Sequence, residues 1–287
     1  MGQNDRNNHI ISSFVIVAIT KGDYNTRNDQ REGTIMNSRQ KYLVKLLEEQ
    51  GDMELGKMVE ELGVSEATVR RDLHVLEEAG QLLRTLGGAK LLEPPSLVVR
   101  TFEEKWAYMR LEKERIARAA AEFVQPGMIV ALDSGTTAWR VAAALKEKSP
   151  LTIVTAALAP IEELGSVEGI TVHCVGGRFR LDNLDFVGYG AVAAVEELRA
   201  DIAFLGADGF VAGKGAYSTD EASAALAGAL ARCADGRIVV TDHTKFAAKG
   251  HCLVVEATDL HCVITDAGLD KTTREALEAD PYEVVVV

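Results

Sequence analysis

The sequence predicts an α/β fold in two parts: a short helical segment with a β-hairpin, followed by a larger domain with a mainly parallel sheet. Three observations predict it. The length of 287 residues is about that of two typical domains. Residues 36–92 carry apolar side chains at helical spacing. Beyond residue 126, short apolar runs alternate with helical stretches, which is typical of a parallel sheet covered by helices.

The composition is that of a globular chain. Hydrophobic residues make up 47% and charged residues 26%, which excludes a disordered chain. The formal net charge of −12 argues against non-specific binding to nucleic acid or to an anionic membrane. The four cysteines (Cys174, Cys233, Cys252 and Cys262) are widely separated, which fits neither a disulfide framework nor a zinc site. We therefore expect a cytoplasmic protein with no metal and no membrane contact.

Residues 1–35 are expected to form a poorly ordered extension. The apolar run Ile10–Thr20 is too short to span a bilayer. Only Arg6 precedes it as a positive side chain, and no small-residue cleavage site follows, so the run does not fit a secretory signal. Residues 21–33 are polar and charged without a helical or strand period.

Three helices are expected in the first domain, over residues 36–92. The first begins at Ser38 and ends at Gly51, and the second covers Leu55–Leu62. Ser65 is a good N-cap for the third, Glu66–Ala79. Two short extended runs around a glycine turn follow, which predicts a hairpin over residues 81–92.

Two helices joined by a short glycine-containing turn, with a hairpin after them, make a helix-turn-helix with a wing. The second helix of such a unit fits the major groove of DNA. Hydroxyl side chains suit hydrogen bonds to bases or phosphates, and arginines suit phosphates or guanine. The third helix buries three apolar residues and leaves a polar face exposed. The candidate DNA-binding residues are Ser65, Thr68, Arg70, Arg71, His74, Arg84 and Lys90.

A helical scaffold or a protein-binding winged helix is the alternative for this domain. It carries eight basic and ten acidic side chains, a net charge of −2, whereas a DNA-binding domain usually has a basic footprint. The distribution favours DNA, because Arg70, Arg71 and Arg84 belong to the predicted reading surface while glutamates gather on the first two helices.

The motif of the third helix is long and specific. The run Val64–Leu73 reads V-S-E-A-T-V-R-R-D-L, and Gly87–Ala89 follows as G-G-A. This segment resembles the DeoR family of bacterial transcription regulators. The resemblance implies sequence-specific binding to an operator, usually as a repressor.

The second domain is expected over residues 104–287, after a linker over residues 93–103. The two prolines in Glu93–Ser96 disfavour helix. A long helix is expected over Phe102–Ala121. The expected strands are Met128–Leu132, Leu151–Thr155, Ile170–Val175, Ile202–Leu205, Arg237–Thr241, His261–Thr265 and Tyr282–Val287, and the expected helices are Thr137–Lys148, Gly188–Arg199, Glu221–Ala234 and Lys271–Glu278.

Polar groups follow several of these strands. The loop Asp133–Thr137, D-S-G-T-T, opens a helix, and backbone N–H groups there can bind an anion. Asp208 and Asp242 follow two other strands, and Lys245 supplies a cation. Together these groups suit a polyhydroxylated phosphate. The plain alternative is that each aspartate only caps a turn, and the P-loop spacing is absent.

The same loops extend the resemblance. Asp133–Thr137, Gly176–Arg178, Gly206–Gly209, Asp242–Lys245 and Ile264–Asp266 recur in DeoR family sensor domains, which are similar in fold to ribose-5-phosphate isomerase. The resemblance implies a phosphorylated sugar as effector. The candidate effector-binding residues are Asp133, Ser134, Gly135, Thr136, Thr137, Thr155, Gly177, Arg178, Asp208, Gly209, Thr219, Glu221, Asp242 and Lys245.

One departure from the family stands after the second strand. Ala156 and Ala157 occupy positions where the family often has Asn, which implies that one hydrogen bond to the effector is missing.

Two classes of function fit these observations. We predict a DNA-binding regulator of a carbohydrate-metabolism operon, with operator DNA and a phosphorylated sugar as partners, no cofactor, and a homo-oligomeric state that matches two-fold operators. The alternative is a sugar-phosphate isomerase in which Asp208 and Glu221 move protons. It is disfavoured, because a sensor of the same fold would keep the same groups for binding alone.

Overall fold

The computed structural model describes residues 37–50, 52–78, 81–91, 102–248 and 250–287. The predicted extension over residues 1–35 lies outside the described residues. So do the expected helix stops at Gly51 and Gly80 and residues 93–101 of the predicted linker.

The first part of the chain forms the three predicted helices, α2 (Ser38–Gln50), α3 (Leu55–Leu62) and α4 (Glu66–Glu78). Gly63 ends α3 with a φ of +61°, and its N–H donates to the Val59 carbonyl at 3.0 Å. That left-handed conformation is one glycine adopts without strain. The apolar side chains facing one another from the three helices are buried, and they include Leu43, Leu47, Met58, Val69, Leu73 and Leu76.

A three-stranded antiparallel sheet accompanies these helices. The predicted hairpin is β2 (Leu82–Arg84) and β3 (Gly88–Leu91), and β3 also pairs with β1 (Met53–Glu54). Strand β1 was not predicted, because two residues are too short to show alternation. A Cβ at Gly88 would lie 1.8 Å from the Met53 carbonyl oxygen, so this position has room only for glycine.

The second part contains a seven-stranded sheet in which every neighbouring pair is parallel. Its order is β15-β14-β12-β9-β4-β5-β6. The strands are β4 (Ile129–Leu132), β5 (Leu151–Thr155), β6 (Ile170–Cys174), β9 (Ala200–Leu205), β12 (Ala234–Val240), β14 (Cys262–Thr265) and β15 (Glu283–Val286). The predicted fold class, a winged helix-turn-helix followed by a mainly parallel α/β domain, is confirmed.

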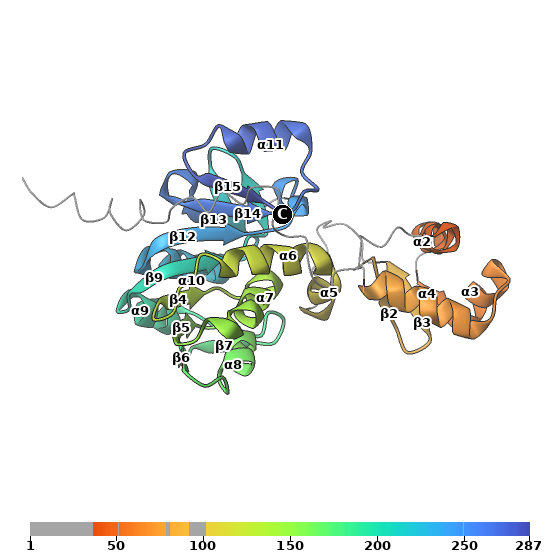
Figure 1. Ribbon diagram of the computed structural model, residues 1–287, viewed down its shortest axis with the longest axis horizontal. Helices are drawn as coiled ribbons and strands as arrows, with labels where there is room; N and C mark the ends of the chain where they lie inside the picture. The colour runs from red at the N-terminus through yellow and green to blue at the C-terminus, as the bar shows by residue number, and fades with distance from the viewer. Residues whose placement is uncertain (1–36, 51, 79–80, 92–101, 249) are drawn as a thin grey trace, which may run out of the picture. The chain divides into compact units, whose positions relative to one another are not determined.

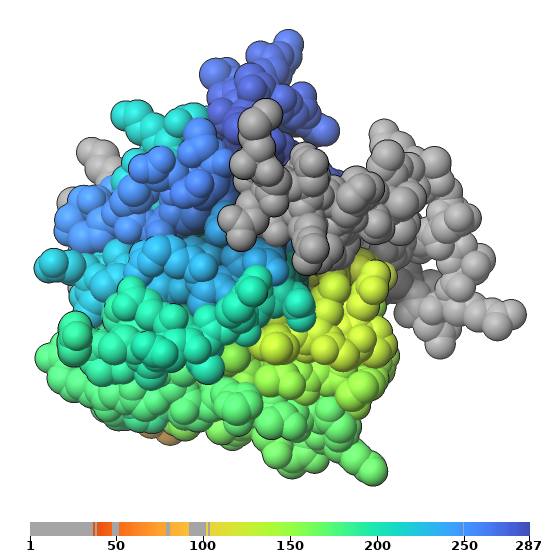
Figure 2. Space-filling view, turned by 90° about the vertical axis from the view of Figure 1, so that its left-hand side faces the viewer, coloured from red at the N-terminus to blue at the C-terminus, as the bar shows by residue number. Residues whose placement is uncertain are grey.

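Helices cover both faces of this sheet (Figure 1). One core contains α6 (Arg110–Ala121), α7 (Thr136–Ala144) and α8 (Leu158–Leu164) against alternate strand residues such as Val130. The opposite core contains α9 (Tyr189–Glu196) and α10 (Glu221–Cys233) against residues such as Ala131. Figure 2 shows one face of this domain, with earlier segments of the chain (green) at the bottom and the last segments (dark blue) at the top. Both strand faces are apolar because helices bury both of them.

The expectation of a single helix over Phe102–Ala121 is wrong. The structure has two helices there, α5 (Phe102–Ala107) and α6, separated at Met109, whose φ is +53°. The break lets Trp106 of α5 pack on Trp139 of α7, with ring centroids 4.3 Å apart. Helical periodicity does not reveal such a break, because its cause is a contact with a distant part of the chain.

Short elements complete the domain. Helix α8 was missed because Pro160 interrupts the pattern, yet this residue lies in the first turn, where its missing N–H costs nothing. Two small antiparallel sheets were also missed: β7 (Arg178–Arg180) with β8 (Asp185–Val187), and β10 (Gly209–Val211) with β11 (Gly215–Ser218) and β13 (Cys252–Glu256). The remaining helices are α11 (Lys271–Glu278), η1 (Leu145–Lys148), η2 (His243–Phe246) and η3 (Ala257–Asp259).

Candidate functional site

Helix α4 carries the predicted reading face. Ser65 precedes the helix, accepts a hydrogen bond from the Thr68 N–H at 3.4 Å, and its Oγ lies 2.9 Å from Thr68 Oγ1. These bonds satisfy groups at the helix N-terminus and hold both hydroxyls at its exposed end. Arg70, Arg71 and His74 are exposed, as expected. Whether these side chains contact DNA stays a prediction.

The charged side chains of this face differ in their partners. Arg70 pairs with Glu66 one turn earlier at 2.7 Å, and His74 Nε2 lies 3.7 Å from Glu78. Arg84 on β2 donates to Glu77 at 2.6 Å. Within the described ranges, Arg71 has no ion-pair partner. Exposed pairs of this kind contribute about 0.5 kcal/mol or less, so a phosphate can displace the glutamates at small cost.

Asp72 is a residue of this motif whose role the sequence did not reveal. It is buried, and its carboxylate accepts hydrogen bonds from Arg39 Nε at 2.5 Å and from Gln40 Nε2 at 3.2 Å, both on α2. The Asp72 carboxylate raises the pKa of the Arg39 guanidinium by hydrogen bonding. The aspartate of the R-R-D run therefore fixes α4 against α2. Its position directly after two exposed arginines was the only available signal.

The wing is short. Lys90 on β3 faces Leu83 on β2 in register, and the turn between the strands contains Leu86, which is fully exposed. The Thr85 N–H donates to the Gly88 carbonyl at 3.0 Å, which closes this turn. Arg84 and Lys90 thus lie on the two strands of the predicted wing, and their contact with DNA stays a prediction.

The second site lies where the order of the parallel strands reverses. Strands β4, β5 and β6 follow one another towards one edge, while β9, β12, β14 and β15 run towards the other. Ligands of open parallel sheets bind beyond the carboxyl ends of the strands at such a point. Asp133 follows β4, Gly206 follows β9, and the Gly206 N–H donates to Asp133 Oδ2 at 3.0 Å. The two halves of the sheet therefore meet at Asp133.

Asp133 is buried, and its other oxygen accepts from the Ser134 N–H at 2.7 Å. Burial raises the pKa of this carboxyl from 3.8 to about 7, although the hydrogen bonds from Gly206 and Ser134 oppose the rise. The carboxylates of Asp185 and Asp208 raise it further. Near neutral pH a substantial share of Asp133 is therefore uncharged, and an uncharged acid can lie beside an anion without repelling it.

The predicted anion loop is the N-terminus of α7. Gly135, the N-cap of α7, adopts a φ of +109°, a conformation open to glycine, and it has no side chain with which to cap the helix. Thr136 is buried and donates to the Lys105 carbonyl at 3.3 Å, while Lys113 Nζ donates to Thr136 Oγ1 at 3.1 Å. The first N–H groups of α7 thus stand at a helix terminus with a positive dipole and a buried ammonium nearby.

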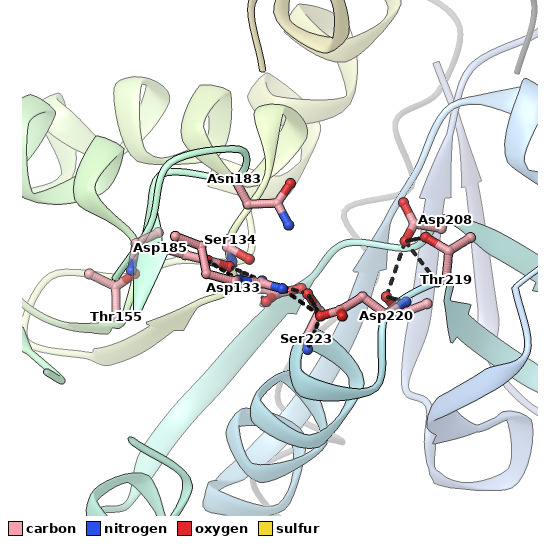
Figure 3. A network of polar contacts seen from close by, with 12 residues as sticks. Asp133, Ser134, Thr155, Asn183, Asp185, Asp208, Thr219, Asp220 and Ser223 are labelled. Carbon is pink, nitrogen blue, oxygen red and sulfur yellow. Dashed lines mark hydrogen bonds and ion pairs between the residues drawn. The ribbon is translucent and has the colours of Figure 1, made fainter. Parts of the chain in front are cut away.

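Asp208 lies beyond β9 on the other side of this region, as Figure 3 shows. Its Oδ2 accepts from Ser218 Oγ at 3.0 Å, from the Thr219 N–H at 2.9 Å and from Thr219 Oγ1 at 3.0 Å. Burial raises its pKa, but the bonds from Thr219 and the charges of Lys245 and Lys105 outweigh it, so the net pKa lies below 3.8. Asp208 is therefore a charged group held among hydroxyls.

The N-cap of α10 is the neighbour of the candidate residue Thr219. The cap is Asp220, which accepts from the Ser223 N–H at 2.8 Å. The hydroxyl of Thr219 instead donates a hydrogen bond to Asp208. Glu221, the first residue of α10, is exposed. The run Ser218–Asp220 offers three side chains able to cap, and the sequence does not distinguish them.

Arg180 joins the β7–β8 hairpin to α10. It donates to both oxygens of the fully buried Asp185, at 2.9 and 2.7 Å, and to Asp220 at 2.5 Å. These carboxylates raise the pKa of the guanidinium. Figure 3 shows Asp220 and Ser223 between the groups of Asp133 and Asp208. The predicted candidate was Arg178, which is exposed; Arg180 lies two residues further along the same strand.

Other predicted residues have backbone or turn partners. Thr155 is fully buried, donates to the Leu132 carbonyl at 2.9 Å and accepts from the Ala157 N–H at 3.1 Å. Asp242 is buried and caps η2 through the Thr244 N–H. A Cβ at Gly177 or Gly209 would lie within 3 Å of backbone atoms. A direct contact of any of these residues with an effector stays a prediction.

Ala156 and Ala157, where the sequence departs from the family, contact the β7–β8 hairpin through their backbone. Both are buried, the Phe186 N–H donates to the Ala156 carbonyl at 2.8 Å, and Ala157 forms a bridge with Asp185. The loop after β5 therefore holds the β7–β8 hairpin through its backbone. Neither alanine has a polar side chain to offer a ligand.

A separate cavity of about 390 Å³ lies between η2 and α11, and none of the predicted effector residues lines it. His243 on its wall has Nδ1 2.7 Å from the buried Asp266. Across the described ranges, no group of three His, Cys, Asp or Glu side chains could hold a metal ion. No helix in those ranges is long and apolar enough to cross a membrane.

Two family models match the chain. The DeoR C terminal sensor domain matches residues 109–267, and the DeoR-like helix-turn-helix domain matches residues 39–94. The transcriptional repressor AccR of Agrobacterium fabrum is 32% identical over 86% of this chain and 94% of its own length. The glycerol-3-phosphate regulon repressor of Escherichia coli is 31% identical over 78% of this chain and 88% of its own length.

One solved structure with a detectable likeness is ribose 5-phosphate isomerase A of Methanocaldococcus jannaschii. It is 18% identical, covers 47% of this chain and 53% of its own, and has a TM-score of 0.36. A likeness of this size supports no conclusion about function.

Proposed function

Because the chain belongs to the DeoR family and is a DNA-binding transcription regulator with a small-molecule sensor domain, we propose that it represses a carbohydrate-metabolism operon and that a phosphorylated sugar controls it. Members of this family are regulators, so the isomerase alternative is set aside. A regulator of this kind acts on the chromosome, and we therefore place it in the cytoplasm. We further propose a homo-oligomer, because two-fold operators match two-fold proteins.

The observation that carries the proposal is the strand-order reversal between β4 and β9. At this point α7 begins at Gly135, an N-cap without a side chain, close in sequence to Asp133, whose pKa is raised to about 7. Free N–H groups at a helix terminus suit a phosphate. Asp208, with its lowered pKa, and the cation of Lys245 suit hydroxyl groups and negative charge on the remainder of the ligand.

The chemistry of the site therefore matches the two ends of a sugar phosphate. Backbone N–H groups and the partly neutral Asp133 would receive the phosphate. Asp208 would accept hydrogen bonds from sugar hydroxyls, for which Thr219 now substitutes. The name of the E. coli relative, a glycerol-3-phosphate regulon repressor, supports a phosphorylated effector of the same general kind.

On the DNA side, we propose that α4 enters the major groove with Thr68 and Arg71 towards base edges. Arg70 and Arg84 would bind phosphates after leaving Glu66 and Glu77. Phosphate contacts of this kind make binding salt-dependent. They would allow an acidic chain to bind DNA, because Arg70, Arg71 and Arg84 are exposed on α4 and β2.

Ligand binding tests the sensor half of the proposal. The full chain is titrated with ribose 5-phosphate, fructose 6-phosphate, glucose 6-phosphate and glycerol 3-phosphate, and binding is followed by calorimetry and thermal shift. We expect one compound to bind, and Lys245→Met to weaken it about tenfold, which is the effect of losing one charged hydrogen bond. Lys146→Met, which removes an exposed lysine paired with Glu163, is the matched control and should change nothing.

The corresponding non-phosphorylated sugars serve as the second control. Equal binding of the phosphorylated and free sugars would contradict a phosphate-binding loop at α7. An unchanged affinity in the Lys245→Met variant would contradict the role given to that lysine.

A further inference from the structure

Helix α5 packs against α7, the helix whose N-terminus forms the proposed phosphate site. Trp106 of α5 packs on Trp139 of α7 with ring centroids 4.3 Å apart. The guanidinium of Arg140 on α7 lies 3.8 Å from the Trp106 ring centroid and donates to the Trp106 carbonyl at 2.9 Å. The two tryptophan rings and the arginine guanidinium therefore hold α5 and α7 together.

Lys105, the residue before Trp106, is held by its backbone at the phosphate loop. Its carbonyl accepts from Thr136 Oγ1 at 3.3 Å and from Lys113 Nζ at 2.7 Å. Lys113 also donates to Thr136 Oγ1 at 3.1 Å. An anion at the α7 N-terminus competes for the same hydroxyl and ammonium, because a charged acceptor forms stronger hydrogen bonds than a carbonyl.

The side chain of Lys105 reaches two other walls of the site. Its ammonium donates to Asn183 Oδ1 at 3.0 Å, in the turn between β7 and β8. Its charge also contributes to the lowered pKa of Asp208, which places the ammonium within electrostatic reach of that carboxylate. Asn183 is a neutral acceptor, so a phosphorylated ligand between these groups is the stronger partner for Lys105.

We propose that Lys105 senses the effector and transmits its binding to α5, an inference that rests on the proposed function of the site. In the unliganded chain its ammonium is held by Asn183 and its carbonyl by Thr136 and Lys113. A phosphorylated sugar takes over the ammonium and weakens the carbonyl contacts, so α5 shifts on α7. In the sequence, α5 is the first described helix after the DNA-binding segment, with residues 92–101 between them.

The chain has a built-in probe of this contact. It contains two tryptophans, Trp106 and Trp139, and these are the residues that pack between α5 and α7. All tryptophan emission of the chain therefore comes from the two residues of this contact. A purely structural role for Lys105 would not couple ligand binding to that emission.

The test uses the full chain and the phosphorylated compounds named above, with calorimetry for binding and tryptophan emission for the α5–α7 contact. For the wild type we expect binding and an emission change that saturate together. Lys105→Met should bind about fivefold more weakly and lose the emission change, within the range of typical coupling energies. Lys105→Arg, which keeps the charge, should restore both.

Asn183→Ala is the second variant, and it leaves Lys105 intact. Removing the competing acceptor should tighten ligand binding about twofold, and it should move the emission of the unliganded chain towards that of the bound state. This variant keeps the proposal testable if Lys105→Met does not fold.

Two outcomes separate the failures. If wild type and Lys105→Met bind a compound equally and show the same emission change, the role of Lys105 is overturned while the proposed function stands. If no phosphorylated compound binds the wild type, the proposed function fails and this inference fails with it.

Discussion

The exposed face of α4 and the carboxyl edge of the parallel sheet hold their charged side chains in different ways. On α4, Arg70 lies in solvent and pairs with a glutamate of the same helix. At the sheet edge, Arg180 is mostly buried and holds Asp185 and Asp220, which come from different segments of the chain. The first arrangement leaves arginines ready to exchange partners. The second fixes the walls of a site before any ligand arrives.

This difference predicts where substitutions act. Changes on the α4 face should alter DNA binding with little effect on folding. Changes in the buried network, and at the one buried carboxylate of α4, should alter folding first.

Asp133→Asn should have the largest effect, and the effect should depend on pH. The pKa of Asp133 is raised from 3.8 to about 7 in the folded chain, so the folded state binds the extra proton between these values. The contribution of Asp133 to stability therefore falls as pH rises from about 4 to about 7. Asn cannot ionise, so from near pH 5 to near pH 8 the variant should gain about 3 kcal/mol relative to the wild type. Urea unfolding at a series of pH values measures the free energy of unfolding of the wild type and of the variant. Parallel curves of this free energy against pH would contradict the burial argument.

Asp72→Ala should destabilise the helix-turn-helix by about 2 kcal/mol, because Arg39 loses its buried acceptor and α4 loses its bond to α2. Denaturant unfolding, followed by circular dichroism, measures this. Asp52→Ala, an exposed aspartate of the same segment, is the control and should change stability by less than about 0.5 kcal/mol. Equal stabilities of the two variants would show that Asp72 does not anchor the helix.

Arg71→Ala should leave the fold intact and weaken operator binding by about tenfold or more, as expected for one lost base or phosphate contact. Fluorescence anisotropy with DNA from the region upstream of the gene measures the affinity. Lys57→Ala, an exposed lysine on α3, is the matched control for simple loss of charge. A similar loss in both variants would indicate a general electrostatic effect instead of a contact by α4.

Glu66→Ala should give the smallest effect. It frees Arg70 from an exposed pair whose contribution to stability is about 0.5 kcal/mol or less. Operator affinity should rise about twofold, because a negative charge beside the phosphates is removed and Arg70 needs no exchange of partner. A clear fall in affinity would place Glu66 among the DNA contacts.

The regular elements could be predicted because their signals are local. Leu55–Leu62 and Lys271–Glu278 were predicted with the bounds that the structure has, since glycine, proline and apolar spacing mark them. The break at Met109 left no such mark. It depends on Trp106 reaching Trp139, which lies 33 residues away in the sequence.

The residues of the candidate site also divide into those that the sequence predicted and those that it did not. Asp133 and Asp208 were found because they follow strands, and parallel strands bring their carboxyl ends to one edge. The sequence did not single out Arg180, which holds this network two residues beyond the candidate Arg178. It also did not single out Asp220, which caps α10 next to the candidate Thr219. Lys105 was not a candidate, because its place at the site depends on the unpredicted turn before α6.

Occupancy of the sensor site should change the affinity of the protein for its operator. The most direct test measures the operator dissociation constant by anisotropy, at fixed salt, with and without a saturating amount of the phosphorylated sugar that binds best. We expect a change of about fivefold or more in the wild type, and in Lys245→Met the same change should need about tenfold more ligand. An operator affinity that is the same with the site empty and filled would contradict it.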